Sequence, residues 1–67
     1  MSGRDVCRIF EASGFVLVRQ KGSHRIMQKR VGDTTTTVPV PDHDDLRRGT
    51  MMSIIRQSGL PRELFEH

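Results

Sequence analysis

The chain has 67 residues, with eleven Lys and Arg against eight Asp and Glu, and a net charge of +3 at pH 7. This length predicts a single domain over residues 1–67 with a shallow core, and the single cysteine excludes an internal disulfide. The longest apolar run, residues 15–18, is too short to cross a bilayer and no apolar signal segment is visible, so we expect a soluble, cytoplasmic protein.

The first predicted element is a helix that begins at residue 2 or 3. Its apolar positions repeat with helical spacing, at Val6, Ile9 and Phe10. Gly14 is the expected left-handed stop, after which Phe15 should fold back onto Phe10.

Three β-strands are predicted next, over residues 15–20, 24–30 and 34–40, with turns at 21–23 and 31–33. Pro39 and Pro41 mark the third strand as an edge strand or one near its end, because proline cannot donate to a ladder. Adjacent apolar residues at 16–17 and 26–27 obscure the period-two pattern, so the face to which each side chain points stays open.

A second helix is predicted after a loop at residues 41–49, with Thr50 as N-cap and Gly59 as stop. Its core positions are Met51, Ile54, Ile55 and Ser58. A short helical turn from Pro61 should bring Leu64 and Phe65 against the body. The order α-β-β-β-α predicts an α+β fold, in which both helices cover one face of a three-stranded antiparallel sheet and leave the other face open for a ligand.

Positive charge is concentrated in the predicted hairpin. Residues 19–30 contain no carboxylate, and the cations among them are Arg19, Lys21, Arg25, Lys29 and Arg30, together with the imidazole of His24. A face with this charge attracts a polyanion by counterion release. The alternative is a solvated edge whose charges prevent aggregation.

His24, which follows the Gly22–Ser23 turn, is the candidate for proton transfer because imidazole titrates closest to neutral pH. RNA carries a nucleophile, the 2′-hydroxyl, beside each phosphate, so its cleavage without metal needs a base, an acid and cations for the developing charge. The structural alternative is that His24 only caps the hairpin, that Gly22 supplies a positive φ and that Ser23 bonds the turn backbone.

A second imidazole, His43, lies among Asp42, Asp44 and Asp45. These residues lack the spacing of a known metal-ligand set. We therefore expect no metal site, and interpret the segment as an acidic loop that holds the basic hairpin or contacts a partner.

Six short blocks, spread over nearly the whole chain, form a more specific pattern than the turn alone. They are Gly14-Phe15, residues 19–26 (RQKGSHRI), residues 38–43 (VPVPDH), Gly49-Thr50-Met51, Ile54-Ile55 and Ser58-Gly59-Leu60. In this order they resemble the HicA family of toxins, also known as YcfA-like. The resemblance implies a fold like that of the double-stranded-RNA-binding domain. It also implies a ribosome-independent mRNA interferase that uses His24 as its catalytic residue and is blocked by a HicB-type antitoxin. We expect no cofactor, because no metal-ligand set is visible in the sequence.

We expect RNA to contact the hairpin at Arg19, Lys21, Gly22, Ser23, Arg25 and Lys29. The three phenylalanines all have the pattern of core residues, which leaves no aromatic stacking platform and predicts weak sequence selectivity. A non-catalytic double-stranded-RNA binder is the alternative function. That module clamps phosphates with lysines at the start of its second helix, where this chain has Thr50, Met51, Met52 and Ser53. A third interpretation is a protein-interaction adaptor that docks an acidic partner on the hairpin.

Overall fold

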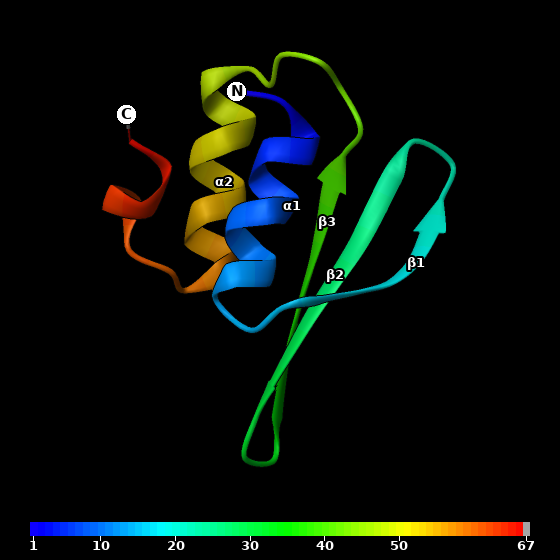
Figure 1. Cartoon of the computed structure of the whole chain (residues 1–67), viewed down its shortest axis with the longest axis vertical. Helices are drawn as coiled ribbons and strands as arrows, with labels where there is room; N and C mark the ends of the chain where they lie inside the picture. The colour runs from blue at the N-terminus through cyan, green and yellow to red at the C-terminus, as the bar shows by residue number, and fades with distance from the viewer. Residues whose placement is uncertain (67) are drawn as a thin grey trace.

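The computed structural model of the chain describes residues 1–66. Its elements are α1 (Gly3–Ala12), β1 (Val16–Lys21), β2 (His24–Val31), β3 (Thr34–Pro41), α2 (Arg48–Ser58) and the 3-10 helix η1 (Arg62–Phe65) (Figure 1). The strands form one antiparallel sheet in the order β1-β2-β3. The predicted α+β fold, its element order and the edge position of the third strand are therefore confirmed. No helix within residues 1–66 combines the length and apolar character needed to span a bilayer.

Helix α1 is bounded by local signals at both ends. At its start, Ser2 and Asp5 form a capping box, in which each backbone N–H donates to the side chain of the other residue at 3.1 Å. At its end, Gly14 adopts a φ of 98°, and the N–H of Phe15 donates to the carbonyl of Phe10 at 2.9 Å. The rings of Phe10 and Phe15 then pack with centroids 4.6 Å apart, as predicted.

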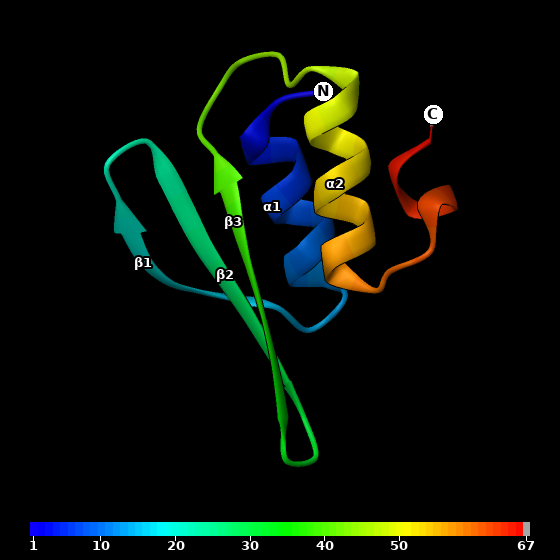
Figure 2. The same ribbon diagram turned by 180° about the vertical axis from the view of Figure 1, so that it is seen from behind.

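The core lies between the two helices and the face of the sheet that carries Met27, Val38 and Val40. Figures 1 and 2 show α1 and α2 side by side. Strand β3 lies between this pair of helices and the β1–β2 hairpin. The largest fully buried side chains are Phe10, Phe15, Met27, Val6, Val38 and Val40. Burial of each such side chain contributes about 1.5–3 kcal/mol to folding.

The pairing of β1 with β2 shows which side chains lie on the open face of the sheet. Leu17 pairs with Met27 and Arg19 pairs with Ile26, so Val18 forms a bulge. Because Met27 points into the core, Ile26 and His24 lie on the opposite, open face. The bulge explains why the apolar run at residues 16–18 does not alternate, and all three of its side chains are about half exposed.

Two predictions about the second half of the chain are wrong. Helix α2 begins at Arg48, with Arg47 as N-cap and no capping side chain, so Thr50 lies inside the first turn. The reason is that Leu46 is buried and donates its N–H to the carbonyl of Met1 at 2.8 Å, which directs the chain into the helix early. Leu64 is 46% exposed, because the single turn of η1 directs only Phe65 of this adjacent pair into the core. The stop at Gly59 is confirmed, with a φ of 71°.

Candidate functional site

His24 is the first residue of β2 and immediately follows the Gly22–Ser23 turn, in which Gly22 has a φ of 59°. Its ring is exposed, and its backbone partners are Lys21 on β1 and Pro41 on β3. The turn is fastened to the end of β3, because the N–H of Asp42 donates to the carbonyl of Ser23 at 2.6 Å. The positive φ of Gly22 confirms its expected role in the turn.

A cationic depression lies on the open face of the sheet beside His24. It has a volume of about 590 Å³ and is lined by Arg19, Lys21, Gly22, His24, Ile26, Thr37 and Pro39. The fold thus brings together four of the predicted site residues. Among residues 1–66, neither Arg19 nor Lys21 forms an ion pair, so both charges are available to an anionic ligand.

A second depression, which we call the α2 groove, also reaches His24. It has a volume of about 420 Å³ and is lined by His24, Pro39, Pro41, Gly49, Thr50, Ser53, Ile54 and Gln57. Sequence reasoning missed its polar residues from α2. The signal that could have revealed them is a polar stripe at positions 50, 53 and 57, since residues at this spacing share one face of a helix.

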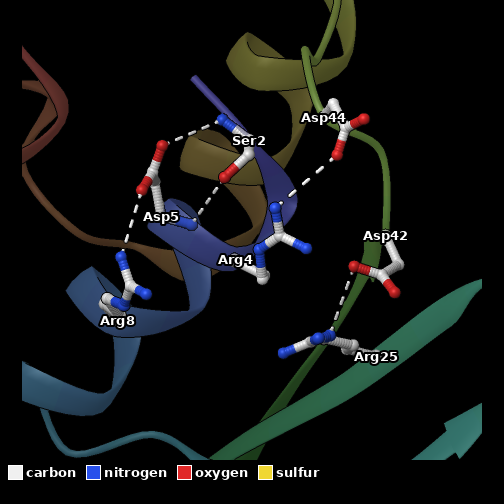
Figure 3. A network of polar contacts seen from close by, with 7 residues as sticks. All are labelled: Ser2, Arg4, Asp5, Arg8, Arg25, Asp42 and Asp44. Carbon is white, nitrogen blue, oxygen red and sulfur yellow. Dashed lines mark hydrogen bonds and ion pairs between the residues drawn. The ribbon is translucent and has the colours of Figure 1, made fainter.

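Arg25 and Lys29 lie on the side of the sheet that faces the helices, away from the cationic depression. Arg25 pairs with buried Val40 across the ladder and lines a small hollow with Cys7 and Met27. Its Nε lies 3.5 Å from Oδ1 of Asp42, an ion pair without hydrogen-bond geometry (Figure 3). The side chain of Lys29 packs against Gly14. A Cβ added at Gly14 would lie 3.2 Å from Cε of Lys29. The structure therefore separates these two cations from the surface that carries His24.

The acidic loop is occupied by ion pairs within the chain. Asp42 pairs with Arg25, Asp44 lies 3.6 Å from Arg4 (Figure 3), and Asp45 lies 3.2 Å from the N-terminal ammonium. These contacts join α1 and the hairpin to the loop, which supports the interpretation that the loop holds the hairpin. Among residues 1–66 no group of three or more His, Cys, Asp or Glu is arranged to hold a metal ion.

Cys7 is the remaining candidate for chemistry, and its surroundings make it inert. The thiol is buried and free, and this burial raises the pKa of Cys7 above its ordinary value. The thiolate, which is the nucleophilic form, is therefore disfavoured. The side chain acts as a small buried hydrophobe.

Comparison with known proteins gives one assignment. The family model described as HicA toxin of bacterial toxin-antitoxin matches residues 3–60. Comparison with curated protein sequences gives no match. The matched segment contains both α-helices, the whole sheet and every residue that lines the two depressions beside His24. The chain therefore belongs to the HicA family of toxins from bacterial toxin–antitoxin systems.

Proposed function

We propose that this HicA toxin is an mRNA interferase, an endoribonuclease that cleaves messenger RNA in the cytoplasm without ribosome or metal and with His24 as its proton-transfer residue. The observation that carries the proposal is the placement of exposed His24 with unpaired Arg19 and Lys21 around one depression. A histidine beside two free cations supplies one of the two proton-transfer groups, and the positive charge, that transesterification of RNA requires.

In the proposed reaction the 2′-hydroxyl of RNA attacks the adjacent phosphorus, and the bond from phosphorus to the 5′-oxygen of the next nucleotide breaks. The imidazole of His24 carries out one of the two proton transfers, either taking the proton of the 2′-hydroxyl or supplying one to the leaving 5′-oxygen, and solvent water carries out the other. Lys21, the cross-strand neighbour of His24, and Arg19 stabilise the negative charge that accumulates on the phosphate oxygens. Proton transfer by a positioned side chain contributes about 10²–10⁴ in rate.

Within this proposal the predicted RNA contacts divide into two groups. Arg19, Lys21, Gly22 and Ser23 are exposed at the hairpin end beside His24 and contact the RNA backbone. Arg25 is a positioning residue instead, because its guanidinium holds Asp42, whose backbone N–H fastens the turn. Lys29 lies beside Gly14 on the helix-facing side and contributes only to the overall positive field.

A HicB-type antitoxin is the proposed partner. The antitoxin binds the toxin at the cationic depression, because covering Arg19, Lys21 and His24 excludes RNA from the proton-transfer group. Acidic side chains on the antitoxin complement these free cations, and its association with the toxin should therefore weaken as salt rises. Co-purification of the toxin with an antitoxin encoded beside it, abolished by Arg19→Glu with Lys21→Glu, tests this part of the proposal.

The test of catalysis compares His24→Ala with His43→Ala, since both histidines are exposed and His43 lines neither depression. Purified proteins are incubated with a long mRNA in buffer containing EDTA, and the cleavage ends are mapped. We expect wild type and His43→Ala to cleave, and His24→Ala to lose at least about 10²-fold in rate with an unchanged circular dichroism spectrum.

Three outcomes would contradict the proposal. Equal cleavage by His24→Ala would remove the catalytic assignment. Inhibition by EDTA that added Mg²⁺ reverses would overturn the metal-free mechanism. Tight RNA binding by wild type with no cleavage would favour the alternative function, a non-catalytic RNA-binding module.

A further inference from the structure

The α2 groove differs chemically from the cationic depression, although both include His24 and Pro39. Apart from His24, no ionisable residue lines the groove. Its polar side chains come from Thr50, Ser53 and Gln57 on one face of α2, and buried Ile54 forms part of its wall. A neutral, polar surface of this kind suits an uncharged group with hydrogen-bonding edges, whereas the cationic depression suits a phosphate.

We propose that the α2 groove binds the unpaired nucleobase next to the cleaved phosphate, and that Ser53 and Gln57 determine which base is preferred. This inference rests on the proposed ribonuclease function and adds a specificity site to it. Because His24 and Pro39 belong to both depressions, an RNA strand that places a phosphate over Arg19 and Lys21 brings an adjacent base to the groove.

The polar pair in the groove is already ordered for recognition. Nε2 of Gln57 donates to Oγ of Ser53 at 3.0 Å, which holds the amide in one orientation. The amide oxygen, its second N–H and the serine hydroxyl proton remain for a ligand. Every base presents neighbouring donors and acceptors on its Watson–Crick edge, and unpaired bases in RNA are read through this edge. The fixed pair therefore matches some bases better than others.

The walls of the groove suit the flat surface of a base. Pro39 and Pro41 contribute rigid apolar rings from β3, whereas Ile54 of α2 also lines the groove but is almost fully buried. The volume of about 420 Å³ falls within the range of small-molecule sites, about 300–1,000 Å³. In this proposal the proline rings take the place of the aromatic platform that the sequence lacks, and the expectation of weak selectivity is replaced by a base preference at one position.

The test uses RNA oligonucleotides that are identical except for A, C, G or U at the nucleotides flanking one mapped cleavage site. Wild type, Ser53→Ala and Gln57→Ala are compared by kcat/KM, with Met52→Ala as the matched control. Met52 is an uncharged, exposed residue of α2 that lines neither depression. We expect wild type and Met52→Ala to prefer one base by about tenfold, and Gln57→Ala to reduce this ratio to about twofold.

A binding measurement separates failure of this inference from failure of the proposed function. His24→Ala and the double variant His24→Ala, Gln57→Ala are titrated with the same oligonucleotides. A base preference in the first protein that is absent from the second supports the groove even where no protein cleaves RNA.

Two results would overturn the inference. In one, wild type cleaves the four oligonucleotides with equal kcat/KM and His24→Ala binds them with equal affinity. The other is a base preference that Gln57→Ala and Ser53→Ala both retain unchanged. In either case cleavage that depends on His24 would leave the proposed ribonuclease function intact.

Discussion

Gly3 is a site where one added methyl group should destabilise the whole fold. It is the first residue of α1, and its N–H donates to the carbonyl of His43 at 2.9 Å. A Cβ at this position would overlap the carbonyl oxygen of Pro41, and would lie 3.1 Å from the carbonyl carbon of Pro41 and 3.4 Å from Cα of Asp42. All three are backbone atoms, so no side-chain rotation relieves the overlap, and α1 must move away from the end of β3.

We expect Gly3→Ala to lower the free energy of unfolding by about 1–3 kcal/mol, the usual cost of overpacking. A chain of 67 residues has a total stability of about 3–10 kcal/mol, so this loss is large. Urea unfolding followed by far-ultraviolet circular dichroism measures it, since the chain has no Trp or Tyr for fluorescence. With a slope of about 1 kcal/mol per molar urea, the midpoint should fall by about 1–3 M.

Gly49→Ala is the matched control, because Gly49 also lies in the first turn of a helix and a Cβ there meets no atom within 4 Å. Alanine restricts the unfolded chain and favours the helix, so this variant should gain about 0.5 kcal/mol. The two substitutions are chemically identical and are expected to shift the midpoint in opposite directions. A Gly3→Ala midpoint equal to or above that of wild type would refute the close approach of α1 and β3.

Four further predictions concern charged and buried side chains. Arg25→Met should destabilise the fold by about 1 kcal/mol in urea unfolding, because its ion pair is only partly buried, and should leave the salt dependence of RNA binding unchanged. Arg19→Met should leave the stability of the fold unchanged. It should reduce the steepness of log RNA affinity against log salt concentration by about 0.7. Hydrogen bonds from Ser2 lower the pKa of Asp5. The stabilisation that the Asp5 carboxylate gives the fold is therefore present above the pKa of the unfolded chain, and it is lost as pH falls through the lower folded pKa. Asp5→Asn should reduce the fall of the urea midpoint with pH between pH 6 and pH 2. Cys7 should react with iodoacetamide only in urea, and fast labelling of the native protein would contradict its burial.

The elements that the sequence predicted correctly are those with local causes. Gly14 and Gly59 end helices because their positive φ values suit glycine, and Gly22 shapes a hairpin for the same reason. Pro39 restricts β3 to a sheet edge because it lacks an N–H. Each of these signals acts within a few residues of its position, so no knowledge of the tertiary structure is needed to interpret it.

The parts that the sequence left open depend on contacts between distant residues. Arg25 and Arg19 look equivalent along the chain, yet the bulge at Val18 and the burial of Met27 place them on opposite faces of the sheet. Thr50 has the chemistry of an N-cap, but the bond from Leu46 to Met1 starts the helix before it. In both cases tertiary packing overrides a valid local preference.

The placement of His24 between two chemically different depressions has the same long-range origin. The hairpin end is fastened to β3 through Asp42 and Ser23, while Gly3 closes against the same stretch of β3 from α1. Because Pro41 pairs with His24 across the ladder, any displacement of Pro41 also moves the imidazole relative to α2. Gly3→Ala should consequently lower the cleavage rate of the protein that remains folded, although Gly3 lines neither depression and makes no contact with RNA in the proposed complex. The geometry of the proposed active site therefore depends on the close approach of α1 to β3 as much as on the hairpin that supplies the histidine.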